Sequence, residues 1–471
     1  MLRSPHSGRK TPMKKTPTTM KFRSISVGAV CSIAIALAVC SFAGSVMAQA
    51  CVPASLASGS LDTCFGSGGK VTTALSGSTT SSAQDVAIQT DGKVVVLANG
   101  FQVLRYNSNG LLDSSFGSGG LATLSFIKSS GDTGAYALAI QSDGKIIVAG
   151  YATIKGSTVG FAVARLNSNG SLDNSFGSGG KVLFNFQSNI SALARGVTIQ
   201  SNGYIVVAGD SEGAFAVARL APNGAFDSGF NGSGKVTVSV ANSTDGIGGA
   251  YDVTTQKVLA GGVLQEKIVA AGIRPRLAVV DRDIAVLRFN PNGSLDSSFG
   301  SGGKVFTNFT GYSDQAKAVA IDANNNIVVA GHTLTSSVPG GQRFALVRYT
   351  ENGQLDTGFG TGGRVTAGTP GYGSAIYGHA LAIQTDGRII ASGYVETADF
   401  AYADFAVVRV NADGTPDTSF GVAGTGIVLT DFYGDRDRAW GGSALQADGR
   451  LVVVGSAYPL PAQVALARYM P

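Results

Sequence analysis

The chain has 471 residues, of which 44% are hydrophobic and only 14% are charged. Its formal net charge is +5, but seven of its 35 basic residues lie in the first 24 positions, which contain no acidic residue. The remaining chain carries 28 basic and 30 acidic residues, and this balance excludes a nucleic acid as the expected partner because no basic surplus is left.

The first 48 residues have the pattern of a secretory signal peptide. A basic segment is followed by an apolar run from Ile25 to about Phe42 and by a short segment of small residues that ends near Ala48. Met20 is an alternative start. A retained membrane anchor is the alternative interpretation, although no basic stop-transfer segment follows. We predict a signal peptide at 1–48, a secreted, periplasmic or cell-envelope location, and a mature chain without a membrane span.

Two cysteines remain after that segment, Cys51 and Cys64, with twelve residues between them. Because exported proteins meet an oxidising environment, we predict a disulfide that fastens the new N-terminus. Lipidation of Cys51 is the alternative, but the sequence AQAC lacks the leucine expected three residues before a lipidated cysteine.

One eleven-residue motif occurs seven times along the rest of the chain. It reads LDTCFGSGGKV from Leu61 and LDNSFGSGGKV from Leu172. From Ala57 to Pro471 the chain divides into seven units of about 59 residues, and such a period indicates a repeat architecture. The aspartates of the motif are Asp62, Asp113, Asp173, Asp227, Asp296, Asp356 and Asp417.

Each unit contains four short apolar segments, as the copy from Ala135 to Phe186 shows. There the segments AYALAI, KIIVAG, FAVARL and KVLFNF are bounded by Asp-Gly or Asn-Gly turns, by one variable loop and by the repeated motif. Short runs rich in Val, Ile, Phe and Ala between such turns predict antiparallel strands. No segment of the repeats shows a helical period.

The predicted strands are apolar on both faces, so each four-stranded sheet needs a neighbour on either side. Sheets of this size around an axis form a β-propeller, whereas a solenoid has a shorter period and an immunoglobulin-like sandwich needs about 100 residues. We therefore expect an all-β fold, a single seven-bladed propeller domain over residues 49–471. The last unit lacks a fourth strand, and Lys70–Leu75 is predicted to fill that place beside Val464–Tyr469.

The succession QSDGKIIVAG, FAVARLN and GSLDNSFGSGGKV resembles the delta-60 repeat, a module of large bacterial secreted and surface proteins, and in outline the NHL-type propeller blade. The resemblance covers about 415 of the 471 residues. It implies a fold but carries over no catalytic residues, because the family has no established ones. The copy from Gly249 to Asn290 departs most, through an insertion that leaves its strand boundaries open.

The repeated motif could be structural or could bind calcium. Asn and Asp oxygens before a glycine suit calcium, but the position of Asn167 is Ala221 in one copy and Thr350 in another. We expect a structural role and no metal ion. The phenylalanine of each motif would pack between blades, and its aspartate would meet a partly buried arginine of the third strand, which needs an anion. These arginines are Arg105, Arg165, Arg219, Arg288, Arg348, Arg409 and Arg468.

Differences between the copies gather in the loops that join second to third strands and in the segments between blades, and we expect function there. We call the side with these loops the variable-loop face, and the side with the Asp-Gly turns and the motif the repeated-motif face. The two histidines on the variable-loop face belong to adjacent blades, and a histidine beside a carboxylate could act as general acid and base. Surface histidines without a role are the alternative. The candidate ligand-binding residues are His332, His379, Tyr394, Asp404, Arg436 and Trp440.

The inner strands bear on the choice between a binding protein and an enzyme. They read DVAIQ, ALAIQ, GVTIQ and AVAID, which predicts an apolar channel lining that hardly varies between blades. Such a lining favours a binding protein that presents variable loops to a protein or glycan, as a monomer and without cofactor. An enzyme in the central channel, such as a lyase, a hydrolase or a quinone-dependent dehydrogenase, is the alternative, and a purely structural envelope module is a third possibility.

Overall fold

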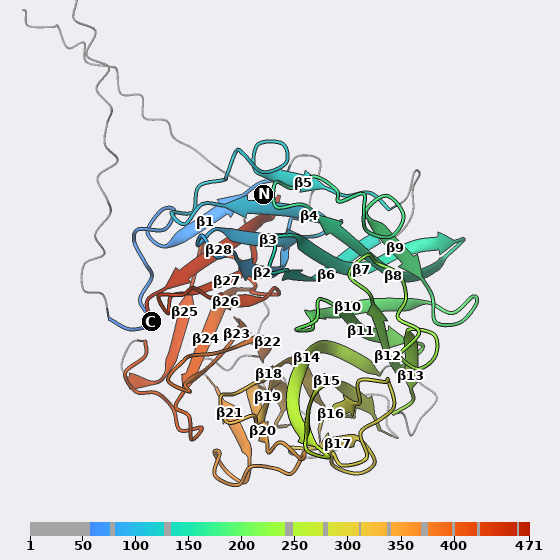
Figure 1. Ribbon diagram of the computed structural model, residues 1–471. Coiled ribbons are helices and arrows are strands. Elements are labelled where there is room, and N and C mark those ends of the chain that lie inside the picture. Colours follow the sequence, from blue (N-terminus) through green and yellow to red (C-terminus); the bar gives the residue numbers. More distant parts are fainter. Residues whose placement is uncertain are drawn as a thin grey trace, which may run out of the picture. The chain divides into compact units, whose positions relative to one another are not determined.

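The computed structural model describes residues 57–75, 81–126, 133–240, 248–276, 281–309, 312–336, 341–368, 375–397, 401–421, 424–458 and 461–471. This part of the chain contains no α-helix, and its strands form seven four-stranded antiparallel sheets. The sheets are arranged as blades around a central axis, with the first strand of each blade innermost (Figure 1). The predicted seven-bladed propeller is confirmed.

The first four blades each use four consecutive strands. Blade 1 comprises β2 (Ala83–Ile88), β3 (Val94–Ala98), β4 (Gln102–Tyr106) and β5 (Leu121–Thr123). Blade 2 comprises β6 (Thr133–Ile140), β7 (Ile146–Lys155), β8 (Thr158–Leu166) and β9 (Lys181–Phe184). Blade 3 comprises β10 (Ala192–Ile199), β11 (Ile205–Ser211), β12 (Ala214–Leu220) and β13 (Lys235–Val238). Blade 4 comprises β14 (Gly249–Ala260), β15 (Val263–Pro275), β16 (Arg282–Phe289) and β17 (Lys304–Thr307).

The last three blades continue the order, except that the final blade takes one strand from the start of the chain. Blade 5 comprises β18 (Asp314–Ile321), β19 (Ile327–Leu334), β20 (Gln342–Tyr349) and β21 (Arg364–Ala367). Blade 6 comprises β22 (Ala375–Ile383), β23 (Ile389–Glu396), β24 (Ala403–Val410) and β25 (Ile427–Thr430). Blade 7 comprises β26 (Ser443–Leu445), β27 (Leu451–Ala457), β28 (Gln463–Tyr469) and β1 (Lys70–Thr73).

Closure of the ring by the N-terminal strand is confirmed. Strand β1 pairs antiparallel with β28, with Lys70 opposite Ala467 and Thr73 opposite Val464. The blue and red ends of the propeller therefore lie side by side in one blade (Figure 1). This pairing covers the outer edge of β28, which would otherwise be left without a partner.

The hydrophobic core is divided among the interfaces between blades. Each core cluster joins two neighbouring blades; the cluster between blades 1 and 2 combines Val95 and Val103 with Leu138 and Val148. The phenylalanines of the repeated motif, such as Phe116, are fully buried in these clusters. Apolar residues on both faces of every strand are thus explained, because each blade is covered on both sides.

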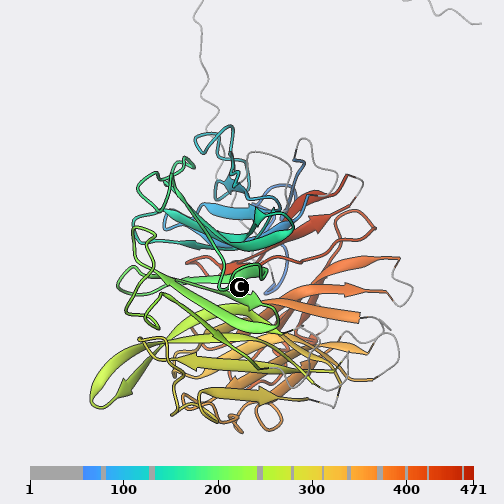
Figure 2. The same ribbon diagram turned by 90° about the vertical axis from the view of Figure 1, so that its right-hand side faces the viewer.

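One blade extends on the side that the sequence predicted to be uniform. In blade 4 the strands β14 and β15 are longer than their equivalents and stay paired up to Ala260 opposite Val263. This hairpin replaces an Asp-Gly turn, so it projects from the repeated-motif face (Figure 2). Departures from the repeat therefore occur on both faces, and not on the variable-loop face alone.

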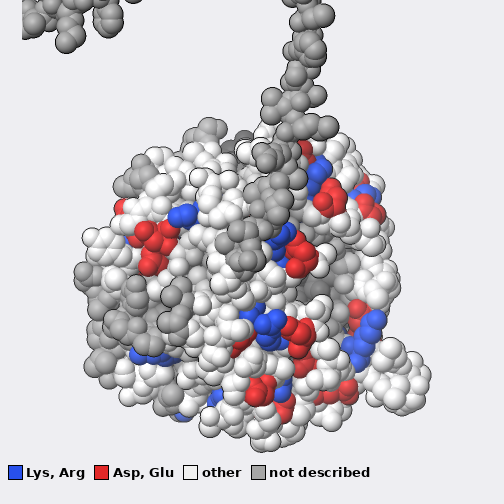
Figure 3. Space-filling view, turned by 90° about the vertical axis from the view of Figure 1, so that its left-hand side faces the viewer, with Lys and Arg blue, Asp and Glu red and all other residues white. Residues whose placement is uncertain are grey.

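Each of the seven third-strand arginines makes an ion pair with the aspartate of a repeated motif. The arginine also lies over the motif phenylalanine, with 4.4–4.9 Å between the guanidinium carbon and the ring centroid. In Figure 3 basic and acidic side chains lie next to one another on the face shown. The seven pairs of a third-strand arginine and a motif aspartate have nitrogen–oxygen distances of 2.6–2.8 Å. They are Arg105–Asp113, Arg165–Asp173, Arg219–Asp227, Arg288–Asp296, Arg348–Asp356, Arg409–Asp417 and Arg468–Asp62.

The ion pair of blade 2 shows how the motif links neighbouring blades. Arg165 donates through Nε to Asp173 and through Nη1 to the backbone carbonyl of Pro222 in the next blade. The Ser175 hydroxyl, together with Lys145 and Arg165, holds the pKa of the Asp173 carboxyl well below its usual range. The pair is therefore ionised at neutral pH, and the bond from Arg165 to Pro222 crosses the interface between blades 2 and 3.

The N-terminal expectations concern segments that are mostly outside the described residues. Cys64 is disulfide-bonded. Cys51, its expected partner, and the expected signal peptide at 1–48 lie outside the described residues. In the described part of the chain, no helix has the length and apolar character needed to cross a membrane.

Candidate functional site

The inner strands of six blades contain a one-residue β-bulge. In blade 5, Ala316 pairs with Gly331 and Ala318 pairs with Ala330, so Lys317 is an extra residue without a partner in the ladder. A bulge re-aims the side chain of its extra residue and often occurs beside binding sites. The six bulged residues are Gln84, Tyr136, Arg195, Tyr251, Lys317 and His379.

A glycine on the second strand makes room for the bulge. A Cβ atom at Gly331 would lie 1.9 Å from the carbonyl oxygen of Gln315, a separation that no side chain permits. Glycines at the equivalent position of four other bulged blades would meet an inner-strand carbonyl at 1.8–2.0 Å; they are Gly150, Gly209, Gly272 and Gly393, whereas blade 1 has Ala98 at this position. The recurring glycine after the second apolar run thus lets the inner strand approach closely.

The six bulged side chains line one cavity of about 660 Å³ at the centre of the propeller, and in blade 7 Trp440 joins them. The bulges fall in the first half or at the middle of each inner strand, so the cavity lies toward the variable-loop face. The expectation of an apolar, nearly uniform channel lining is wrong. It missed the residue before each apolar run, which is where the copies differ.

Two cations, Arg195 and Lys317, and the ring of Tyr251 form one side of the cavity. Arg195 donates through Nε to Asp210 at 2.8 Å, and its guanidinium carbon lies 4.7 Å from the ring centroid of Tyr251. The Lys317 ammonium lies 3.8 Å from the same centroid. Burial, followed by the charges of Arg195 and Arg282, lowers the pKa of Lys317 to about 7. The lysine is therefore a cation held mainly by an aromatic face.

Two aspartates also line the cavity, and both are bonded to the backbone. Asp85 accepts hydrogen bonds from the amides of Val86 and of Leu138 in the next blade, each at 2.8 Å. Asp252 has the equivalent bonds to its own strand and to the following blade. Burial, the largest cause, raises the pKa of Asp85 to about 7 and that of Asp252 to about 6. These carboxyl groups connect blades and also titrate near neutrality.

Four of the six candidate residues from the sequence come together beside the cavity. The rings of His379 and Tyr394 are stacked at 5.6 Å, and Trp440 lies 4.8 Å from Tyr394 and 5.6 Å from His379. His332 lies 6.5 Å from His379 on the adjacent blade, and Tyr377 stacks on Tyr394 at 4.8 Å. We call these five residues the aromatic cluster.

The members of the aromatic cluster differ in exposure. Trp440 is 38% exposed, whereas His332 and Tyr394 are buried, at 7% and 3%. Burial lowers the pKa of His332 to about 3 and that of His379 well below its usual range. Among the described residues neither histidine bonds to a carboxylate, so the acid–base pair that the sequence left possible is not formed there. His332 and Tyr394 support the cluster from within, and Trp440 is its exposed member.

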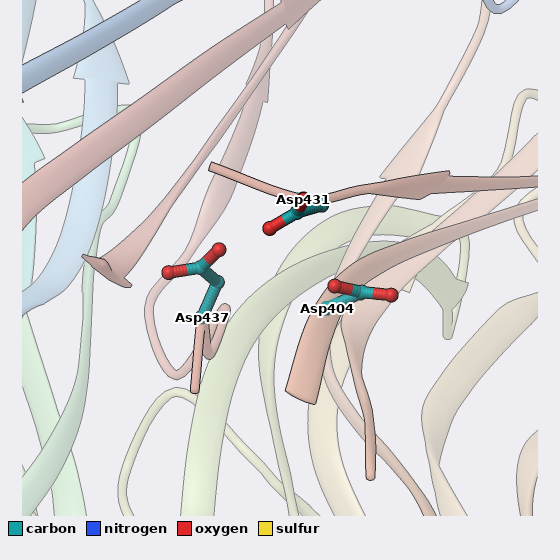
Figure 4. A group of neighbouring side chains, drawn as sticks. All are labelled: Asp404, Asp431 and Asp437. Atoms are coloured by element: carbon teal, nitrogen blue, oxygen red, sulfur yellow. The ribbon is translucent and has the colours of Figure 1, made fainter. Parts of the chain in front are cut away.

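The other two candidates, Asp404 and Arg436, do not line the cavity. Asp404 lies with Asp431 and Asp437 in a group whose carboxylate oxygens are within 4.8 Å of one another (Figure 4). Asp437 is buried and accepts the backbone amides of Phe432 and Tyr458. Part of this acidic group is therefore explained by the conformation of the segment between blades 6 and 7.

A similar arrangement occurs two interfaces earlier, between blades 4 and 5. Asp314 accepts the backbone amide of Phe309, as Asp437 accepts that of Phe432, and Asn308 stands at the position of Asp431. The Asn308 side chain donates to Asp283 at 3.0 Å, and the later segment has the carboxyl group of Asp431 in place of that amide. The group is thus a variant of a structural arrangement that recurs in the repeat.

Sequence reasoning missed the residues that line the cavity. The candidate residues from the sequence do not include Arg195, Tyr251, Lys317 or the two cavity aspartates, although the repeats contain a signal for the bulged residues. Aligning AQDVAI, AYALAI, ARGVTI, AYDVTT, AKAVAI and GHALAI shows a second position that reads Gln, Tyr, Arg, Tyr, Lys and His between positions that hardly change. A variable position inside an otherwise repeated strand was the available indication.

The comparison with protein-family models agrees with the fold. A family model described as a β-propeller domain of unknown function, DUF5122, matches residues 89–116, 141–176, 200–230, 267–299, 323–359 and 384–420. These six matches support a propeller-repeat family. No curated protein matches the sequence.

Several solved structures align with most of this chain. Virginiamycin B lyase from Staphylococcus aureus is 11% identical, with 84% of this chain and 98% of that one covered and a TM-score of 0.46. An ulvan lyase, a polysaccharide lyase, is 12% identical over 80% and 90%, with a TM-score of 0.42. Drosophila Semaphorin 1b, extracellular domains 1–2, is 10% identical over 88% of each chain, with a TM-score of 0.43. These likenesses assign no activity.

Proposed function

We propose that this β-propeller repeat protein is an exported binding protein, and that its ligand is a glycan that enters the central cavity from the variable-loop face. The observation that supports the proposal is the position of Trp440, which borders the cavity and is partly exposed. A cavity of about 660 Å³ lies in the usual range for ligand sites, which combine aromatic walls with a few polar groups.

A glycan fits this site better than a folded protein does. A concave cavity accepts the end of a narrow chain, whereas a protein partner would need a broad surface. The aromatic cluster gives Trp440 a rigid support, since His379 and Tyr394 pack against it. Rigid aromatic rings provide large contact areas at low entropic cost.

Trp440 is the only tryptophan of the chain, so its fluorescence reports directly on the cavity. We expect glycans that bind chain 49–471 on an array to change the tryptophan emission on titration. Trp440→Ala should weaken binding at least about 10-fold, as for a central aromatic contact. Tyr402→Ala is the matched control, because Tyr402 is 56% exposed and does not line the cavity. Equal affinities of both variants and the parent would contradict the proposed site.

An enzyme in the central channel is the second candidate. It is favoured by the carboxyl groups of Asp85 and Asp252, which line the cavity and whose raised pKa values of about 7 and 6 suit proton transfer near neutral pH. The glycans bound in the preceding experiment distinguish the two functions. Cleaved or altered glycans after incubation, detected by mass spectrometry and absent with Asp85→Asn, would indicate the enzyme.

We also propose that residues 1–48 direct export, that the mature protein acts as a monomer, and that its repeat is of the delta-60 type. The basic start, the apolar run and the small residues near Ala48 support export, as does the disulfide-bonded Cys64. The mass of the N-terminal peptide from a bacterial periplasmic or culture fraction tests this. A chain that retains residues 1–48 would overturn the export proposal.

A further inference from the structure

The central cavity contains a cation without a counter-ion. Lys317 makes no ion pair and no hydrogen bond with any residue that the structure describes, and its ammonium contacts the face of Tyr251. Burial and the nearby positive charges lower its pKa to about 7, as expected for an ammonium that lacks a nearby anion. A cation that is removed from water without a partner is costly unless a ligand supplies the anion.

A second cation stands beside the first. Arg195 and Lys317 both lie over the ring of Tyr251, at 4.7 and 3.8 Å from its centroid. Arg195 bonds to Asp210 through Nε alone among the described residues, so its two terminal nitrogens remain available. A guanidinium edge and an ammonium within one cavity suit a carboxylate or a sulfate.

The carboxyl groups of the cavity do not fill this role. Both oxygens of Asp85 and of Asp252 are occupied by backbone amides. Neither aspartate forms an ion pair with Lys317 or Arg195, and burial raises the pKa of both carboxyls, so their charge is diminished below neutral pH. The two cations therefore keep the capacity to bind an external anion.

We propose that Lys317 and Arg195 form the subsite for the anionic group of a carboxylated or sulfated saccharide in the central cavity. This inference rests on the proposed function and adds the class of ligand to it. Tyr251 holds both cations in place, and the aromatic cluster across blades 5 to 7 takes the uncharged part of the sugar chain. The anionic group thus lies on one side of the cavity and the aromatic contact lies on the other.

Matched oligosaccharides test the subsite. Neutral, glucuronate-containing and sulfated members of equal length are compared on an array at pH 6, where Lys317 is charged. We expect the anionic members to bind the chain 49–471. Lys317→Met should weaken the affinity for these anionic members about 10- to 100-fold, as for the loss of a charge-assisted contact. Lys155→Met is the control, because Lys155 is exposed at the end of β7 and does not line the cavity. Equal binding of neutral and anionic members, unchanged in Lys317→Met, would overturn the proposal.

A separate measurement distinguishes a failed subsite from a failed glycan function. Thermal unfolding is followed while glucuronate or sulfate alone is added. Either anion should stabilise the parent chain and Lys155→Met, but not Lys317→Met or Arg195→Met. Stabilisation without glycan binding keeps the subsite and removes the proposed function. If neither anion shifts the unfolding temperature, the subsite is wrong, even if glycans bind through Trp440.

Discussion

Replacing Asp296 by alanine should lower the free energy of unfolding by about 3–5 kcal/mol, the usual cost of leaving a buried charge without its partner. Asp296 accepts from Arg288 at 2.8 Å and lies 3.4 Å from Lys267. The side chains of Arg288 and Lys267 are 0% and 4% exposed, so two cations would lose their anion in a place that water hardly reaches.

The same substitution in a more exposed copy is the control. In the Arg348–Asp356 pair the side chains are 12% and 22% exposed, and Asp356→Ala should cost about 1 kcal/mol because solvent screens the remaining charge. Chemical denaturation of both variants gives the comparison. The double variant Asp296→Ala, Arg288→Met should recover part of the loss, since it removes the unpaired charge. Equal costs for Asp296→Ala and Asp356→Ala would show that burial of the pair is not what matters.

Deleting residues 49–76 should prevent stable folding of the propeller. The deletion removes β1 and exposes the edge of β28. It also removes Phe65, which is fully buried between blades 7 and 1, and Asp62, the partner of Arg468. A lost core phenylalanine or a broken buried pair each costs about 3–5 kcal/mol. Together these losses approach the total stability of a typical domain, about 5–15 kcal/mol.

The chain 49–471 is the reference, and heat denaturation followed by circular dichroism is the measurement. The chain 77–471 should show no cooperative transition above room temperature. A synthetic peptide of residues 49–76 should restore the transition by supplying the missing strand in trans. A chain 77–471 that melts at the temperature of the reference would show that closure by β1 contributes little.

Most of the fold could be predicted from the sequence because its signals are local and repeat seven times. Asp-Gly and Asn-Gly turns delimit the strands, and apolar residues on both faces require a neighbour for every sheet. The missing strand of the last unit predicted β1 beside β28. The pairing of third-strand arginines with motif aspartates also followed from the repeat, since each unit has one of each.

The cavity is harder to predict, because a bulge depends on the register between two strands. Its sequence signals are limited to one variable position in the inner strand and a glycine opposite it in most copies. In a regular strand, successive side chains point to opposite faces of the sheet, and the directions of Lys317 and Arg195 would follow from this alternation. The extra residue of the bulge interrupts the alternation. The exposed fractions of the His332 and Tyr394 side chains could not be predicted from the sequence either. Both faces of a blade are covered by neighbours, so alternation along a strand does not tell whether a side chain reaches water.

The bulges also have a consequence for how ligand preference could change. Gln84, Tyr136, Lys317 and their equivalents occupy the same backbone position although their side chains have little in common. The backbone there is fixed by strand pairing and, in five of the six blades, by the opposing glycine, not by the bulged side chain. When one unit is duplicated, the new copy therefore contains a bulged residue whose side chain already lines the cavity and can be substituted. A nearly symmetric scaffold can in this way acquire an asymmetric pocket through single substitutions that leave its folding untouched.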